Sequence, residues 1–270
     1  MKTRKKIVAV ACAVVLSMSL FMLGACSSNT DNNSSADTST SGDTTTQKTY
    51  VIATDTTFAP FEFQDASGNY VGIDMDILAA VAKDQGFQYT VNALGFDAAL
   101  QALTSGQADG VIAGMSITDE RKQTFDFSDP YFDSGVVMGI SSSNDTIKGY
   151  SDLKGMKVAV KIGTEGETFA NSIKDQYGFT TVQFKDSATM YQDVIAGNSQ
   201  ACFEDYPVLG YAISQGLGLK EVTDMERGSS YGFAVAKGQN QDLLQMFDAG
   251  LANIKADGTY QAILDKYIQK

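Results

Sequence analysis

The order of apolar and polar segments constrains the fold of this chain more than any other feature of its sequence. Residues 50–113 read as strand, helix, strand, helix and strand, at 50–54, 73–85, 87–91, 97–103 and 108–113. The same order recurs later, with strands at 156–160, 181–184 and 201–203 and helices at 164–177 and 188–197. Strands that are separated by helices run parallel, so each block predicts a parallel sheet covered by helices. The expected fold is therefore α/β with two similar lobes.

Two extended segments flank the second block and predict the connections between the lobes. They lie at 131–141 and 228–236, and two antiparallel crossings of this kind act as a hinge. We therefore expect one lobe to contain residues 49–133 and 230–270 and the other lobe to contain residues 134–229.

The N-terminal part of the chain is typical of an exported lipoprotein. Basic residues at 2–6 precede an apolar run at 7–22, which is the pattern of a secretory signal peptide over residues 1–25. Leu23-Gly24-Ala25-Cys26 resembles the lipobox of bacterial lipoproteins, whose cysteine is lipidated after cleavage; an ordinary signal with a chance cysteine and an uncleaved anchor are the alternatives. Residues 26–48 are almost entirely polar and predict a disordered tether. The pattern predicts an extracytoplasmic protein that a lipid on Cys26 attaches to the cell membrane.

The composition removes several classes of function. The 270 residues include no histidine, which excludes Ser-His-Asp and Cys-His catalysis and removes the commonest metal ligand. Cys12, Cys26 and Cys202 form no CxxC pair, so neither a zinc site nor a dithiol redox site is expected. A formal charge of −12 opposes binding to nucleic acid. We expect a monomer without cofactor or metal.

The stretch from Ala113 to Arg121 carries the first indication of a ligand. A strand that stops at Gly114 leaves backbone amides and carbonyls open to a ligand, and Ser116 adds a hydroxyl. Arg121 follows on a short polar helix, and its planar guanidinium can bind a carboxylate with two hydrogen bonds. This set of groups suits an α-amino acid. The alternative is that Arg121 is a surface residue paired with a neighbouring acid at 119 or 120.

Polar residues also follow the other predicted strands, where ligands of open parallel sheets bind. Asp55 begins a predicted loop over 55–63, Lys161 to Thr164 follow the strand at 156–160, and Glu204 and Asp205 follow the strand at 201–203. Each has an ordinary structural alternative, such as a turn cap for Asp55, a solvated Lys161, or a cap on the helix at Pro207. Phe58 and Phe96 are equally compatible with a core position. The convergence of these positions from both blocks predicts a cleft between the lobes.

The chain resembles the polar-amino-acid solute-binding proteins of ABC importers, known as family 3, over nearly all of residues 49–270. The resemblance rests on Asp55-Thr56-Thr57-Phe58-Ala59-Pro60-Phe61-Glu62-Phe63, Gly72-Ile73-Asp74-Met75-Asp76, Ala113 to Arg121, Phe127-Ser128-Asp129-Pro130-Tyr131 and Asp257-Gly258-Thr259-Tyr260. Within the family the chain is most similar to glutamine-binding proteins, through residues 53–56 and 159–161.

The resemblance implies a Venus-flytrap fold that encloses one amino acid. It implies that Arg121 binds the α-carboxylate near Ser116 and Thr164, and that Asp205 and the Gly114 carbonyl bind the α-ammonium. Phe58 and Phe96 would sandwich the ligand stem, with Asp55 and Lys161 at its far end. Three departures from the family pattern are Ser116 for threonine, Glu204 for the histidine of glutamine binders, and Glu165 for glycine. The implied ligand-binding set is Asp55, Phe58, Phe96, Ala113, Gly114, Ser116, Arg121, Lys161, Thr164, Glu204 and Asp205.

The expected function is delivery of a free polar amino acid to the permease of an ABC importer, with no enzymatic step. Glutamine ranks first, because its amide needs one acceptor and one donor, which Asp55 and Lys161 supply. A basic amino acid ranks second, because Glu204 adds negative charge. The alternative is a periplasmic cyclohexadienyl or arogenate dehydratase on the same fold, with Glu204 and Asp205 as acid–base groups.

Overall fold

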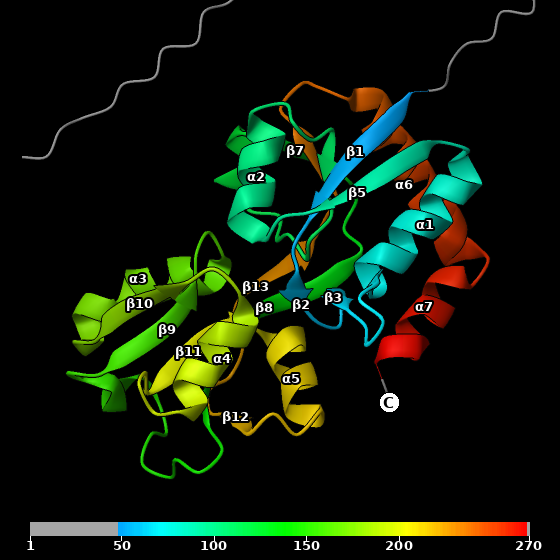
Figure 1. Cartoon of the computed structure of the whole chain (residues 1–270). Coiled ribbons are helices and arrows are strands. Elements are labelled where there is room, and N and C mark those ends of the chain that lie inside the picture. The colour runs from blue at the N-terminus through cyan, green and yellow to red at the C-terminus, as the bar shows by residue number, and fades with distance from the viewer. Residues whose placement is uncertain (1–47, 269–270) are drawn as a thin grey trace, which may run out of the picture. The chain divides into compact units, whose positions relative to one another are not determined.

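The computed structural model describes residues 48–268 of the chain. The expected signal peptide, Cys26 and residues 26–47 of the expected tether lie outside the described residues. Within residues 48–268, no helix combines the length and apolar character that crossing a bilayer requires. This part of the chain is an α/β structure with two main sheets (Figure 1).

The first sheet has the strand order β5-β1-β6-β14-β7. Its strands are β1 (Thr49–Thr54), β5 (Gln88–Ala93), β6 (Gly110–Val111), β7 (Phe125–Phe127) and β14 (Ala234–Ala236). β1 pairs in parallel with β5 and β6, as expected, whereas β14 runs antiparallel to β6 and β7. Ile52 packs with α1 (Ile73–Gln85), α6 (Gln241–Ala256) and α7 (Thr259–Tyr267), while Ala53 packs with α2 (Phe96–Thr104). Neighbouring strand residues face opposite ways, so helices cover both faces of this sheet.

The second sheet has the order β10-β9-β11-β8-β12, and β13 also pairs with β8. Its strands are β8 (Phe132–Ser141), β9 (Lys157–Lys161), β10 (Thr180–Phe184), β11 (Ala201–Asp205), β12 (Leu219–Glu221) and β13 (Glu226–Tyr231). The short helix η2 (Tyr150–Leu153) and α3 (Glu165–Tyr177) pack on one face, and α4 (Ser187–Ile195) and α5 (Tyr206–Ser214) on the other. β12 was not expected. β11 is two residues longer than expected, so Glu204 and Asp205 belong to the strand rather than to the loop after it.

β8 and β13 connect the two lobes, which we define by these two sheets and their helices. The strands pair antiparallel, with Phe132 opposite Tyr231, and both lie between the two halves of the molecule in Figure 1. The second crossing is divided, because β13 ends at Tyr231 and β14 begins at Ala234. Between them Gly232 lies tightly against Ile117, where an added Cβ would be 2.8 Å from the isoleucine side chain.

A small third sheet occupies the segment that the sequence analysis assigned to a loop. β2 (Thr57–Phe58), β3 (Glu62–Gln64) and β4 (Tyr70–Val71) pair antiparallel beside α1. The expected continuous loop over residues 55–63 is therefore wrong, since strands of two or three residues are too short to show a period of two. β6 covers only Gly110–Val111 and is therefore shorter than the strand expected at 108–113.

Candidate ligand-binding site

The carboxyl ends of strands from both sheets meet around a small, enclosed cavity of about 10 Å³. Its lining residues are Phe58, Phe96, Ala113, Gly114, Ser116, Arg121, Lys161, Thr164, Glu165 and Asp205. Nine of the eleven residues in the expected set are among them, while Asp55 and Glu204 lie behind the wall. The cavity holds about one water molecule. An amino acid can therefore occupy it only if the two lobes separate further.

Arg121 belongs to the first lobe and reaches across to the second. It begins the short 3₁₀ helix η1 (Arg121–Gln123). One guanidinium nitrogen donates to the Ser116 carbonyl at 2.8 Å and the other donates to the Gly163 carbonyl at 3.0 Å. The group also lies 5.3 Å from the centre of the Phe96 ring. The surface ion pair that was the alternative is not formed by Arg121, since Asp119 pairs with Lys122.

Glu165 adds a carboxylate at the same end of the cavity. It lies 3.9 Å from Arg121 and 3.3 Å from Arg227 of β13. The sequence analysis noted Glu165 as a departure from the family pattern but did not include it in the expected set. Thr164 caps α3 by accepting from the Glu167 amide. The Glu167 carboxylate accepts from the amide of Gly163.

Lys161 and Asp55 form a direct ion pair between the lobes. The ammonium lies 2.5 Å from Asp55 Oδ2, and the two side chains are 1% and 0% exposed. The ammonium also donates to Ser187 Oγ at 3.3 Å and lies 4.3 Å from the centre of the Phe58 ring. Burial disfavours this charge, but Asp55 and Glu204 offset the effect and raise the pKa of Lys161 above its usual value. Lys161 does not follow its structural alternative, because it is buried rather than solvated. Asp55 binds Lys161 with one oxygen, while its other oxygen accepts from the Thr56 amide at 2.6 Å.

Glu204 points into the second lobe, behind the cavity wall. The Ser187 and Tyr191 hydroxyls donate to Glu204 Oε2 at 2.8 and 2.9 Å, and the Asp205 amide donates to Oε1 at 3.0 Å. Ser187 therefore joins Glu204 to Lys161. Sequence reasoning did not identify Ser187 or Tyr191, which lie on the helix that Asp186 caps.

Asp205 faces the cavity from the end of β11 and is bound by a residue of the hinge. Tyr231 donates to Asp205 Oδ2 at 2.6 Å, and Ser134 donates to the Tyr231 hydroxyl at 3.0 Å. Burial and the nearby Glu204 raise the pKa of Asp205 to about 7. The alternative role as a helix cap is not observed, since the Asp205 side chain makes no capping bond to α5. Tyr231 is a further site residue that the sequence pattern did not single out.

Gly114 takes a backbone conformation that favours glycine. Its φ is +51°, and an added Cβ would lie 2.3 Å from the Phe58 ring. The sequence analysis expected amides and carbonyls at this strand end to be open to a ligand. For the Gly114 amide this is wrong, because it donates to Asp74 Oδ2 at 2.7 Å.

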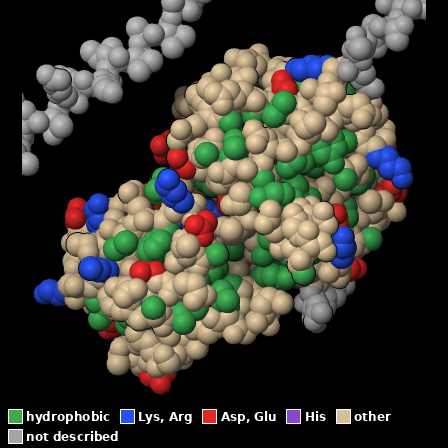
Figure 2. All heavy atoms as spheres, in the orientation of Figure 1, with side chains coloured by type: hydrophobic (Ala, Val, Ile, Leu, Met, Phe, Trp, Pro, Cys, Tyr) green, Lys and Arg blue, Asp and Glu red, His purple; other side chains and the backbone are tan. Residues whose placement is uncertain are grey.

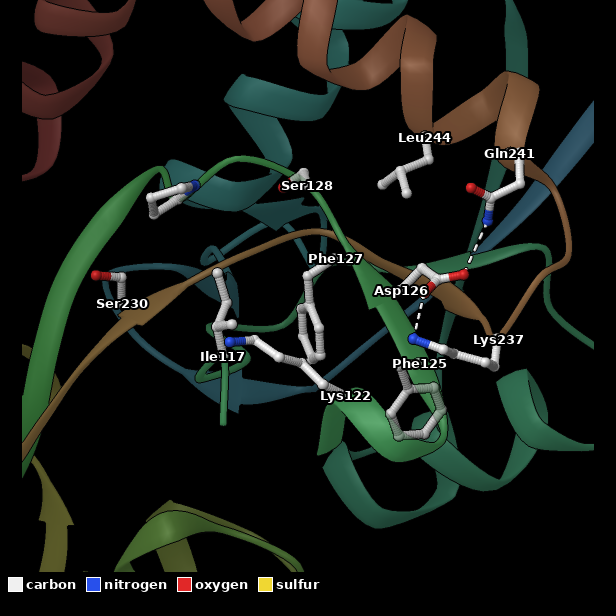
Figure 3. A pocket seen from close by; sticks show the side chains of 11 residues that line it. Ile117, Lys122, Phe125, Asp126, Phe127, Ser128, Ser230, Lys237, Gln241 and Leu244 are labelled. Atoms are coloured by element: carbon white, nitrogen blue, oxygen red, sulfur yellow. Dashed lines mark hydrogen bonds and ion pairs between the residues drawn. The ribbon is translucent and has the colours of Figure 1, made fainter. Parts of the chain in front are cut away.

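A larger groove of about 640 Å³ lies elsewhere, between β7, β13 and α6 (Figure 3). Ile117, Phe127 and Leu244 form its apolar part. Its acid, Asp126, is already bound by Lys237 at 2.7 Å and by Gln241 at 3.0 Å. None of its lining residues lies between 134 and 229, whereas the smaller cavity is lined from both parts of the chain, so the smaller cavity is the better candidate despite its volume.

In Figure 2 basic and acidic side chains are scattered over the visible face rather than gathered in one basic patch. Within residues 48–268, no group of three or more His, Cys, Asp or Glu side chains is placed to hold a metal ion. Cys202 is buried and is not part of a disulfide.

Two α/β lobes that are joined by β8 and β13 and enclose a charged cavity have the architecture of the flytrap class of ligand-binding proteins. The sequence model of the bacterial extracellular solute-binding proteins, family 3, matches residues 50–270. The chain belongs to this family.

Relatives of the chain include binding proteins with several ligands. The ABC transporter arginine-binding protein 1 of Escherichia coli is 32% identical, covering 78% of this chain and 87% of the relative. An ancestral arginine-binding protein, solved with glutamine and also with arginine, is 38% identical over 82% of this chain and 98% of its own, with a TM-score of 0.76. Substrate-binding domain 2 of Lactococcus lactis GlnP in an open conformation is 44% identical over 83% of this chain and 97% of its own, with a TM-score of 0.56.

Proposed function

We propose that this protein binds a free polar amino acid outside the cytoplasm and delivers it to the permease of an ABC importer. The observation that carries the proposal is the placement of Arg121 and Asp205 on opposite lobes around one cavity. A guanidinium binds an α-carboxylate and a carboxylate binds an α-ammonium. The same two groups would therefore hold any α-amino acid, whatever its side chain. The ligands of the relatives, arginine and glutamine, support this class of ligand.

Glutamine is our first choice of ligand and a basic amino acid our second. Lys161 and Asp55 place one donor and one acceptor at the far end of the cavity, only 2.5 Å apart. A primary amide can replace that contact by bonding to both groups at once. Glu204 makes the local formal charge negative, which supports a basic ligand as the second choice. The relative that was solved with both glutamine and arginine is consistent with this ranking.

Binding and release require movement at the hinge. The cavity is smaller than an amino acid, and contacts such as Lys161–Asp55 and Arg121–Gly163 join the lobes. We propose that residues 49–133 with 230–270 and residues 134–229 move as two lobes about β8 and β13. The ligand stabilises the closed form, and the permease recognises that form. We propose that the protein acts as a monomer.

We also propose that a lipid on Cys26 anchors the protein to the membrane. The support is the sequence pattern of residues 1–26, which ends in the lipobox-like Leu23-Gly24-Ala25-Cys26. Two or more acyl chains give stable attachment. Mass spectrometry of the mature N-terminus tests the proposal: an unmodified Cys26 in the membrane fraction contradicts it.

A thermal-shift screen of the twenty amino acids tests the binding function, because a ligand that binds the native state raises the unfolding temperature. We expect shifts with glutamine or with arginine and lysine, confirmed by calorimetry. The rival dehydratase activity is tested by incubation with prephenate and arogenate. Glu204 is unsuited to acid–base catalysis in this arrangement, since it lies behind the cavity wall and accepts hydrogen bonds from Ser187 and Tyr191. Turnover of either compound without any amino-acid binding would overturn the proposal.

A further inference from the structure

A pair of buried carboxyl groups lies behind the cavity and has no part in the proposed ligand contacts. Glu62 comes from β3 and Asp74 from the first turn of α1, and both side chains are 0% exposed. The two groups lie close enough together for each to shift the pKa of the other. Among the described residues, no donor group forms a hydrogen bond to either oxygen of Glu62 or to Asp74 Oδ1. Buried carboxylate oxygens without donors are costly, and a proton shared by the two acids would reduce that cost.

The other oxygen of Asp74 is fully used. Asp74 Oδ2 accepts from the Gly114 amide at 2.7 Å and from the Tyr131 hydroxyl at 2.9 Å. The Gly114 amide shares one peptide plane with the Ala113 carbonyl, and both residues line the cavity. The orientation of Asp74 therefore fixes the orientation of backbone groups at the ligand site.

The charges around the pair place the proton on Glu62. Burial, then Asp74 and Asp55, raise the pKa of Glu62 well above its usual range, while Lys161 opposes them. Burial raises the pKa of Asp74 only to about 6, because the Gly114 amide, the Tyr131 hydroxyl and Glu62 stabilise its charge. Near neutral pH, Asp74 is then ionised and Glu62 is neutral.

We propose that Glu62 is a positioning residue for ligand binding, which donates its proton to Asp74 Oδ1 and thereby fixes the Gly114 peptide at the cavity wall. The shared proton pairs two of the three oxygens that otherwise lack a donor. Asp74 then accepts from three sides, and its carboxylate cannot rotate without breaking a bond. The role in ligand binding rests on the proposed function, whereas the protonation of Glu62 does not.

The first experiment measures the ligand-free protein and is independent of any ligand. Thermal unfolding is followed from pH 5 to pH 10 for the wild type, Glu62→Gln and the exposed control Glu226→Gln. A group whose pKa is raised by folding loses its stabilising proton as the pH rises, so the wild type and the control should lose stability toward alkaline pH. Glu62→Gln keeps a donor that cannot ionise and should lose less. A ¹³C NMR titration of the Glu62 carboxyl should show it protonated at pH 7.

Equal pH profiles for the wild type and Glu62→Gln, or an ionised Glu62 in the NMR titration at pH 7, would overturn the proposal. So would a Glu62→Gln variant that is as unstable at pH 7 as Glu62→Ala. If Glu62→Ala does not fold, the comparison of the wild type with Glu62→Gln still decides.

The second experiment measures affinity by calorimetry at pH 7 with the amino acid that gives the largest thermal shift. Glu62→Gln should bind as the wild type does, and Glu62→Ala should bind roughly tenfold more weakly, because Asp74 loses a donor. Equal affinity of Glu62→Ala and the wild type would overturn the positioning role. If the wild type binds no amino acid, the proposed function fails, but the stability and NMR results still decide where the proton resides.

Discussion

The two ends of the cavity hold their cations in different ways. At the far end, Lys161 and Asp55 are almost fully buried and 2.5 Å apart. At the other end, Arg121 is bound by two backbone carbonyls, and its acid partner Glu165 is 3.9 Å away and shared with the 39% exposed Arg227. A buried pair is costly to break, whereas carbonyl contacts can be exchanged for a ligand. The far end should therefore determine stability and ligand choice, and the Arg121 end should determine affinity for amino acids in general.

The largest effect is expected when the buried pair is broken. Lys161→Met leaves Asp55 buried without its cation, which should lower the free energy of unfolding by about 3–5 kcal/mol. The same variant should weaken glutamine binding and reduce the penalty on arginine. Urea unfolding and calorimetry measure the two effects.

Lys122→Met is the matched control, because Lys122 pairs with the 99% exposed Asp119. Exposed pairs of this kind contribute about 0–1 kcal/mol. If Lys161→Met costs no more than this control, the ion pair between the lobes does not stabilise the ligand-free protein. The comparison between the two ends would then be wrong.

The second effect concerns affinity rather than stability. Arg121→Ala should weaken every amino acid alike by about 2–5 kcal/mol, because it leaves the α-carboxylate without its cation. Arg121→Ala should lower the free energy of unfolding less than Lys161→Met does. The only acid that loses a partner is Glu165, which still pairs with Arg227. Calorimetry with glutamine, arginine and lysine checks the uniformity. A loss confined to one of the three ligands would place Arg121 at the side-chain end.

The third effect is a pH dependence of binding through Asp205, whose pKa burial and Glu204 raise to about 7. The ammonium of the ligand needs the ionised form, so affinity should fall roughly tenfold between pH 8 and pH 6. Ligand-free stability should change in the opposite direction. Folding raises this pKa, so the contribution is present below the unfolded pKa of about 4 and is lost as the pH rises through 7.

Tyr231→Phe sharpens this test. It removes the hydrogen bond that lowers the pKa of Asp205, so the midpoint of the affinity profile should move to higher pH. An affinity that does not change between pH 6 and pH 8 would mean that Asp205 is not the partner of the ammonium.

The fold was predictable from sequence to the extent that it depends on local patterns. α1 has the predicted bounds of residues 73–85, and α3 lies within the helix predicted at 164–177. The apolar runs that became β1 and β9 have the length of buried strands. The small sheet of β2, β3 and β4 was missed, and the strand expected at 108–113 was predicted too long for β6, because their pairing depends on distant neighbours and leaves no local period.

The site was predictable where it depends on strand ends, and less so where it depends on side-chain partners. Arg121, Lys161 and Asp205 line one cavity, as their positions after strands suggested. Two features could not be derived from the sequence, because they depend on how the lobes are placed relative to each other. They are the direct ion pair between Lys161 and Asp55 and the orientation of Glu204 away from the cavity. Tyr231 lies about a hundred residues from its partner Ser134, a separation that no local pattern encodes.

The smallest expected effect shows whether Glu165 repels the ligand carboxylate at the Arg121 end of the cavity or helps to hold the ligand there. Glu165 lines the cavity where the ligand carboxylate would arrive, and its negative charge opposes that of the ligand. Glu165→Gln should therefore tighten binding by up to about 1 kcal/mol, the range of an ion pair with one exposed partner, here Arg227. Arg227→Ala should act in the opposite direction, because it frees Glu165 to compete for Arg121. Both effects should shrink as the salt concentration rises. If Glu165→Gln instead weakens every ligand, Glu165 contributes to holding the ligand or the closed lobes, and both ends of the cavity use buried carboxylates in the same way.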